Sequence, residues 1–228
     1  MMLRAGFAVF RKDLLIEWRS RALITRVVPF AVLVLVLFAI ALDSEPLVLR
    51  AGSGLVWMTT LFSALVVVQR TFELERRDGA LDVLKTLGID GAALFFGKAV
   101  AVIVQLIALV VILIGGAIVL YGVDVETSAL VLLVTTAVLG SCGVGLVGTL
   151  YGGLVSGASG RDTLLPLLLM PVTAPVLIGA SRATEFAFGG DAIDASTAWA
   201  WVGLLAVFTA VFAAAGAVSF GPLIDNDA

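Results

Sequence analysis

The chain has 228 residues and a formal net charge of −3; 61% of its residues are hydrophobic, 14% are charged and none is histidine. Its mean hydropathy of +1.16 excludes an ordinary soluble domain and predicts a multi-span membrane protein. Without histidine, and with a single cysteine, the chain lacks the usual general base and the usual zinc and haem ligands. An enzyme is therefore the least expected class, and no nucleic-acid partner is expected.

Residues 1–21 are predicted to form an amphipathic helix at the membrane interface. Its basic residues suit anionic lipid headgroups, which makes membrane anchoring the simpler role and contact with a partner protein the alternative. The apolar stripe recurs at spacings of three and four residues, as one face of a helix requires, and consists of Leu3, Phe7, Phe10, Leu14 and Trp18.

Long stretches without charged residues predict six transmembrane helices, which together would form one all-α transmembrane domain over residues 1–228. The predicted spans are 22–42, 52–69, 99–121, 128–155, 163–181 and 195–219. Twelve of the 14 basic residues lie in the N-terminal segment up to Arg26 or in the loops after the second and fourth spans. Because lysine and arginine are retained on the cytoplasmic side, both termini are predicted to be cytoplasmic.

The cytoplasmic loop 70–98, between the second and third spans, is predicted to carry a short amphipathic helix from Ala80 to about Gly88. The apolar face of this helix must be buried against another surface. Lipid headgroups or the N-terminal helix would serve, but the mixed charges beside the leucines favour a groove on a soluble partner, because they can fix the register against a protein surface. The residues assigned to this docking are Glu73, Glu75, Arg76, Arg77, Asp78, Gly79, Leu81, Asp82, Leu84 and Leu87.

The interior of the predicted spans offers little chemistry of its own. No Asp, Glu, Lys or Arg lies in the middle of any span, which disfavours coupling to an ion gradient. Gly97 and Lys98 lack the remaining residues of a P-loop, so the chain has no nucleotide site. Energy is therefore expected to come from a separate ATPase.

The fourth span is rich in small residues, which let helices approach one another closely in lipid. Packing within the bundle and contact between two copies of the chain are the two alternatives for this face. The residues assigned to it are Gly148, Gly152, Gly153 and Gly157.

The fifth span contains three prolines. Pro166 fits an opening turn, whereas Pro171 and Pro175 remove two interior donors and free the carbonyls of Leu167 and Pro171. The helix is predicted to bend or break there and to face the bundle interior or a cavity, where the freed carbonyls find partners. A hinge that moves during transport and a static kink are equally good interpretations.

Two parts of the chain together resemble the CcmB family, the haem exporter B subunits of cytochrome c maturation system I. The first is LVWMTTLFSALVVVQRTFELERRDGALDVLKTLGIDGAALFFGKAV, and the second is LLPLLLMPVTAPVLIGASRAT. The most specific features are the acidic, arginine-containing segment that ends in Asp78-Gly79-Ala80-Leu81-Asp82-Val83-Leu84 and the proline spacing of the fifth span. The resemblance covers nearly the whole chain.

This resemblance implies the membrane subunit of an ABC-type complex in the prokaryotic inner membrane, with ATP held by a separate cytoplasmic ATPase subunit. The loop helix from Glu73 to Leu87 would be the coupling helix that docks on that ATPase. The resemblance also implies a haem-handling membrane protein and a periplasmic haem chaperone as partners, and the complex would export haem or release the loaded chaperone. A second copy of the chain is expected, because ATP is normally held between two ATPase subunits. Haem would be associated with the complex, its iron held by the partners, and no cofactor is expected on this chain alone.

Two other functions fit the same sequence features. An ABC-2-like permease for a lipid, a drug or a polysaccharide keeps the architecture and changes the cargo, and genomic neighbours would distinguish it. A scaffold that assembles other membrane proteins without transport would keep its function when the partner ATPase is inactive.

Overall fold

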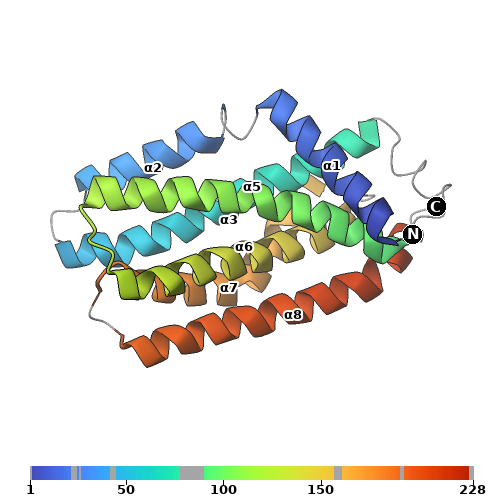
Figure 1. The fold of residues 1–228 in the computed structure, drawn as a ribbon. Coiled ribbons are helices and arrows are strands. Elements are labelled where there is room, and N and C mark those ends of the chain that lie inside the picture. The colour runs from blue at the N-terminus through green and yellow to red at the C-terminus, as the bar shows by residue number, and fades with distance from the viewer. Residues whose placement is uncertain are drawn as a thin grey trace.

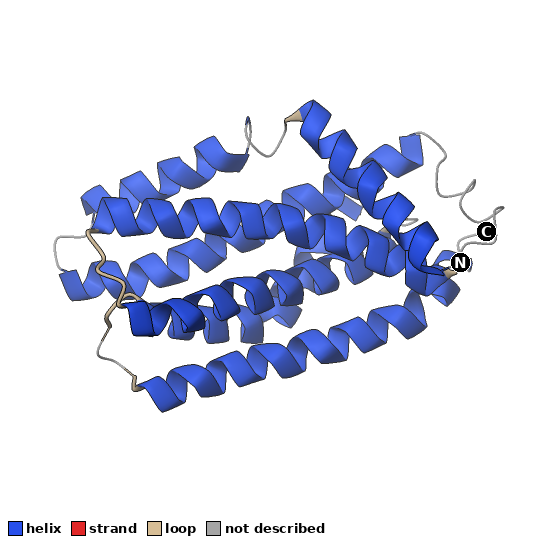
Figure 2. Ribbon diagram, in the orientation of Figure 1, coloured by secondary structure: helices blue, strands red, loops and turns tan. Residues whose placement is uncertain are grey.

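A computed structural model describes residues 2–21, 25, 27–41, 45–77, 90–156, 161–190 and 193–225. Within these residues the chain forms helices joined by short connections, and no strand is present (Figure 2). The all-helical prediction is therefore confirmed. The helices are α1 (Met2–Ser20), α2 (Val28–Ala41), α3 (Glu45–Arg77), α5 (Gly91–Tyr121), α6 (Thr127–Val155), α7 (Arg161–Ala187) and α8 (Ala195–Asp225).

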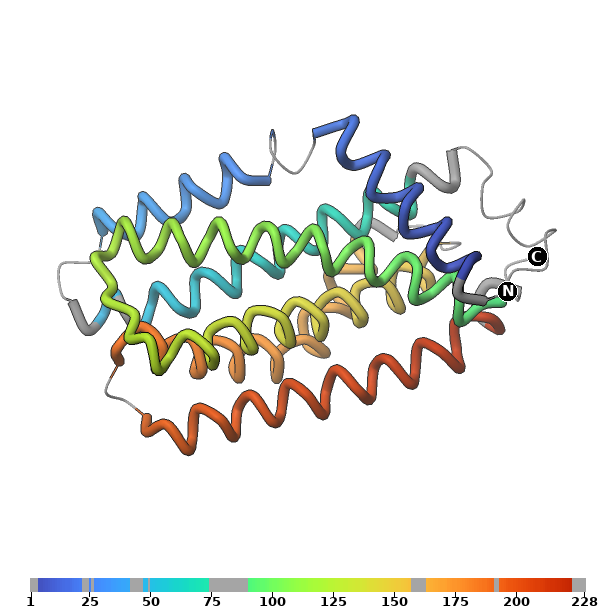
Figure 3. The backbone as a smooth tube through the Cα atoms, viewed as in Figure 1, coloured from blue at the N-terminus to red at the C-terminus, as the bar shows by residue number. Residues whose placement is uncertain are grey.

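The long helices α3, α5, α6, α7 and α8 lie side by side as a bundle, and α2 packs on α3 and α5 (Figure 1). Helix α1 crosses one end of this bundle obliquely and packs on the first turns of α5. The backbone tube shows that α1 begins and α8 ends at this same end (Figure 3). We call it the terminal end. It also holds the last turn of α3 and the first turn of α5, the two helices that segment 78–89 joins along the chain.

Five helices contain stretches that are long and apolar enough to cross a membrane, and they contain five of the six predicted spans. Of the remaining predicted span, 22–42, the part that the structure describes as an α-helix is α2, which has 14 residues. A helix of that length rises about 21 Å, less than the ~30 Å of a hydrocarbon core. The apolar stretches are Arg50–Glu73, Gly91–Tyr121, Thr127–Val155, Thr163–Ala187 and Ala195–Pro222.

Several helices extend well beyond the predicted spans. Helix α3 continues past residue 69 to Arg77, and α5 begins at Gly91 rather than at residue 99. A stretch without charges marks only the part of a helix that suits hydrocarbon, whereas helical hydrogen bonding continues into the polar interface. The prediction that Lys98 lies in a cytoplasmic loop is therefore wrong, because Lys98 is part of α5 and its side chain is fully buried.

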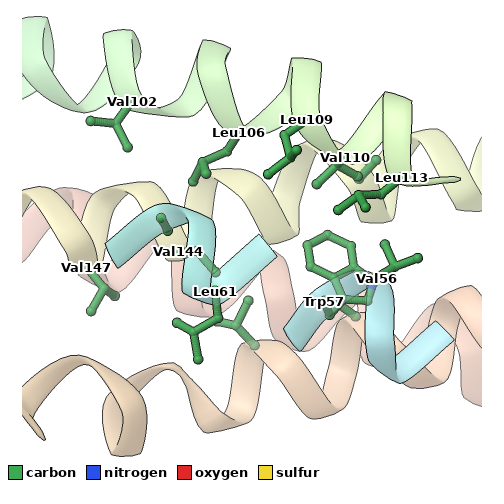
Figure 4. Close-up of a cluster of buried hydrophobic side chains, with 14 of the residues drawn as sticks. Val56, Trp57, Leu61, Val102, Leu106, Leu109, Val110, Leu113, Val144 and Val147 are labelled. Atoms are coloured by element: carbon green, nitrogen blue, oxygen red, sulfur yellow. The ribbon is translucent and has the colours of Figure 1, made fainter. Parts of the chain in front are cut away.

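The middle of the bundle is a core of valine and leucine side chains around Trp57 (Figure 4). Trp57 is fully buried, and its indole N–H donates a hydrogen bond of 2.9 Å to the hydroxyl of Thr184, which ties α3 to α7. A Cβ added at Gly140 would lie 2.3 Å from the Trp57 ring, so the indole packs directly on the backbone of α6. Other buried side chains of the same core come from α3, α5 and α6 and include Val56, Leu61, Leu106, Leu109, Leu113, Val144 and Val147.

Helix α7 carries Pro166, Pro171 and Pro175 inside one continuous helix. The break predicted from these prolines is therefore absent. Pro171 and Pro175 are exposed on the surface of the chain, although α7 packs on α3, α6 and α8; that this span faces the bundle interior or a cavity at the prolines stays a prediction. Pro171 and Pro175 each lack the N–H that would donate to the carbonyl four residues earlier, and the helix continues through both positions. A bend or a hinge at these positions stays a prediction.

The close contact of α1 with α5 depends on Gly97. A Cβ placed there would lie 2.6 Å from the carbonyl oxygen of Gly6 and 3.0 Å from the Cβ of Val9, a distance that no side chain can occupy without moving α1. Gly115 lies on the same helix, and a Cβ added there has no atom within 4 Å. Alanine substitutions at these two glycines can therefore be compared directly, because a Cβ is crowded at Gly97 and has open space at Gly115.

We expect Gly97→Ala and Gly115→Ala to change the free energy of unfolding in opposite directions. G97A should lower it by about 1–3 kcal/mol, because α1 and α5 must separate. G115A should raise it by up to about 1 kcal/mol, because alanine loses less backbone entropy in a helix than glycine does. Thermal unfolding of the purified protein in detergent measures both shifts, and equal shifts of the same sign would contradict the tight contact at Gly97.

Candidate functional site

Helix α1 brings two carboxylates onto the basic ends of α3 and α5. Val9, Asp13 and Glu17 are spaced four residues apart, so they share one face of α1, and this face lies against the bundle. Opposite them lie Arg70 on α3 and Lys98 on α5. We call Asp13, Glu17, Arg70 and Lys98 the terminal charge cluster.

Lys98 is the most deeply buried member of the terminal charge cluster. Its ammonium nitrogen lies 3.8 Å from a carboxylate oxygen of Asp13 and 4.9 Å from the centre of the Phe72 ring. The other carboxylate oxygen of Asp13 lies 3.2 Å from the ammonium nitrogen of Lys12. A buried ammonium is stable only near groups of opposite charge or the face of an aromatic ring, and Lys98 has both. The ion pair with Asp13 therefore attaches α1 to α5.

A second ion pair attaches α1 to α3. The guanidinium of Arg70 lies 3.5 Å from the carboxylate of Glu17. Helix α3 leads into segment 78–89 and α5 leads out of it, so α1 is bound to the helices on both sides of that segment. The two ion pairs therefore connect α1 to the end of α3 and to the start of α5, so that these three helices are held together at the terminal end.

Four of the residues predicted to dock on a partner, Glu73, Glu75, Arg76 and Arg77, belong to the end of α3, beyond Arg70. Glu73 is on the last turns of α3 and is half-buried. Residues 73–77 continue α3, so the predicted helix from Glu73 to Leu87 is not a separate element at its start. The remaining predicted docking residues lie outside the described part of the chain, namely Asp78, Gly79, Leu81, Asp82, Leu84 and Leu87.

Three of the four glycines assigned to helix packing contact other helices of the same chain. A Cβ added at Gly148 or Gly152 would lie 2.9 Å or 2.5 Å from side chains of α3, and one at Gly153 would lie 2.5 Å from Phe220 of α8. These three glycines therefore let α6 pack inside the bundle. Gly157 lies outside the described residues, and its role stays a prediction.

A second ionic cluster lies at the opposite end of the bundle. Glu185 on α7 is buried, accepts a hydrogen bond of 3.1 Å from the guanidinium of Arg182, and lies 3.9 Å from that of Arg50 on α3. The N–H of Gly190 donates to the backbone carbonyl of Glu185 at 3.0 Å and closes the turn after α7. Glu185 therefore fixes the contact between α3 and α7 at this end.

The surface beside this second cluster is acidic. A cleft of about 270 Å³ runs between the start of α6 and the end of α7, with Asp124 and Glu126 on its wall. Asp194 caps the first turn of α8 and accepts hydrogen bonds from Ser196 and Thr197. These hydrogen bonds, that of Ser196 above all, lower the pKa of Asp194 to about 2, so its carboxylate is ionised at neutral pH.

Sequence reasoning missed the terminal charge cluster, although two signals for it were present. The spacing of Val9, Asp13 and Glu17 places both carboxylates on one helix face with an apolar residue. The uncharged stretch 91–97 ahead of Lys98 indicates a helix that begins before the lysine. The partners of these carboxylates are far away in sequence, and no local pattern connects α1 with α3 and α5.

Comparisons with known proteins agree on one family. The chain matches the family model described as CcmB protein over residues 4–221. Heme exporter protein B of Haemophilus influenzae is 31% identical over 180 residues, which are 78% of this chain and 80% of that protein. The protein of the same name from Rhodobacter capsulatus is 31% identical over 190 residues, 82% of this chain and 85% of its own. That from Paracoccus denitrificans is 31% identical over 173 residues, 74% and 77% of the two chains.

Proposed function

We propose that this chain, which belongs to the CcmB protein family, is the membrane subunit of a haem-exporting ABC system whose ATP is hydrolysed by a separate subunit. The observation that carries the proposal is the family match over residues 4–221, which includes almost every described helix. With five helices long enough to cross a membrane and bacterial relatives of the same family, the chain is a multi-pass inner membrane protein.

The ATPase subunit is proposed to dock on segment 78–89 together with Glu73, Glu75, Arg76 and Arg77 at the end of α3. The amphipathic pattern of this segment supports such a contact, because its leucines require an apolar groove. A displacement of the segment would act on α3 and α5, which flank it in the chain. Helix α1 would move with them, because the terminal charge cluster binds it to both helices. ATP hydrolysis would thus be coupled to a joint movement of three helix ends.

Haem is proposed to be carried by the complex rather than ligated by this chain. The chain has no histidine, the commonest axial ligand of haem iron, so a haem-handling membrane protein and a periplasmic haem chaperone would hold the iron. The opposite end of the bundle would then face the periplasm and meet the chaperone. In this arrangement ATP hydrolysis drives either haem export or release of the loaded chaperone. A second copy of the chain provides the docking site for the second ATPase subunit.

Copurification with an ATPase-inactive partner tests this function. Tagged chain should copurify with an ATPase subunit, and the yield of holocytochrome c should fall to background when the P-loop lysine of that ATPase is replaced. A holocytochrome yield that survives this replacement would instead support an assembly scaffold. Intact holocytochrome together with a defect in lipid, drug or polysaccharide export would support a permease for a different cargo.

A further inference from the structure

Helix α1 and the first turns of α5 leave an apolar groove between them at the terminal end. Its volume is about 420 Å³, and its walls include Phe7 and Phe10 of α1 and Ala92, Phe96 and Val100 of α5. The groove is open, since 63% of Phe7, 40% of Phe96 and 42% of Val100 are exposed. We propose that this groove binds an acyl chain of an anionic phospholipid, whose phosphate is held by Arg4 and Arg11.

The groove continues into the lipid-facing surface of α5. Phe96, Val100 and Val104 follow one another at intervals of four residues, so they form one stripe, and all three are exposed. Helix α5 is long and apolar enough to cross the membrane, and exposed apolar side chains of such a helix face hydrocarbon. An acyl chain that lies along this stripe therefore reaches the groove without leaving the apolar phase.

Two arginines give the rim of the groove a positive charge. Arg4 and Arg11 lie three residues before and four residues after Phe7, which places all three on the same side of α1. Both arginines are exposed, and neither forms an ion pair within the described part of the chain. A guanidinium is well suited to a phosphate, because it donates two parallel hydrogen bonds. The apolar groove therefore suits the acyl chain of an anionic phospholipid, and the two guanidinium groups at its rim suit the phosphate of the headgroup.

A lipid fits this site better than a protein segment does. A helix from another protein, or from a second copy, would cover the slot but would also need carboxylates placed against Arg4 and Arg11. A membrane with anionic headgroups supplies that charge along the whole interface, and α1 is itself amphipathic with basic residues. The proposal is independent of the haem-related function, because lipid binding is measured without the ATPase or haem.

Photocrosslinking with a phospholipid that carries a diazirine in its acyl chain tests the proposal on the full-length protein in nanodiscs. Phosphatidylglycerol should label peptides from residues 6–10 and 92–100, and phosphatidylcholine with the same acyl chain should label them about fivefold less. Val100→Trp fills the groove and should reduce the phosphatidylglycerol label by about fivefold. Val111→Trp is the matched control, because Val111 is on the same helix, is 61% exposed and lies outside the groove, and its label should stay unchanged.

The double variant Arg4→Gln, Arg11→Gln tests the headgroup contact separately. Both positions are exposed, so folding should be unaffected, and the phosphatidylglycerol label should fall to the level of phosphatidylcholine. Equal labelling by the two lipids, or a label spread evenly over all exposed helices, would overturn the proposal. Loss of a dimer or of a copurifying protein in Val100→Trp, with no change in lipid label, would show that a protein occupies the groove instead.

Discussion

Replacement of Leu81 and Leu84 by aspartate is expected to abolish copurification of the ATPase subunit and to reduce holocytochrome c to background. The two leucines lie three residues apart and share the apolar face of the helix predicted after Asp78. Two carboxylates placed in an apolar groove without partners should weaken docking by at least about 4 kcal/mol, which is roughly a thousandfold in Kd. Pull-down from detergent extracts and haem staining of c-type cytochromes measure the two effects.

Thr86→Asp is the matched control for these two substitutions. It introduces the same charge into the same predicted helix, but Thr86 lies on the face opposite Leu81 and Leu84. Docking and holocytochrome yield should therefore stay close to those of the unmodified chain. If all three aspartates had the same effect, or if the leucine variants reached normal membrane levels and still bound the ATPase, segment 78–89 would not be the docking site.

Lys98→Met should be the most destabilising single substitution at the terminal end. It removes the fully buried ammonium that lies 3.8 Å from the buried carboxylate of Asp13, so this carboxylate loses the opposite charge on α5. Loss of one member of a buried pair typically costs about 3–5 kcal/mol. We expect a large decrease in thermal stability, faster proteolysis of α1 and a decrease in holocytochrome c.

A double-mutant cycle of Lys98→Met with Asp13→Asn measures the interaction energy of this ion pair separately from the other contacts of the terminal charge cluster. Lys98→Met combined with Asp13→Asn should be less destabilising than the sum of the single changes by at least about 1 kcal/mol, because the double variant has no isolated buried charge. Lys12→Gln should change stability by less than about 1 kcal/mol, since the Lys12 side chain is 38% exposed. Additive effects of Asp13→Asn and Lys98→Met would contradict the coupling of α1 to α5 through this pair.

Hydrophobic patterning was sufficient to predict the helices but not their ends. Five of the predicted spans lie inside long apolar helices because a run without charges is what hydrocarbon requires. The start of α5 was placed too late because Lys98 interrupts the run, although the ammonium is compensated by Asp13 and Phe72. Those two partners come from α1 and α3, so the compensation is a property of tertiary structure.

The prolines of α7 show a second limit of prediction from local sequence. Pro171 and Pro175 predict lost hydrogen bonds, and an isolated helix would be expected to break or to hide them. The helix instead continues, with both prolines on its exposed face. Local rules state which hydrogen bonds are lost, but the packing of α7 on α3, α6 and α8 decides whether the helix survives the loss.

The link between α1 and the rest of the terminal end also constrains how the protein is made. Asp13 and Glu17 emerge from the ribosome long before Arg70 and Lys98, their ion-pair partners. Until those partners arrive, both carboxylates must remain hydrated, which keeps α1 at the membrane surface while α3 and α5 enter the bilayer. Helix α1 is therefore synthesised before α3 and α5 but is fixed in place only when both have been made.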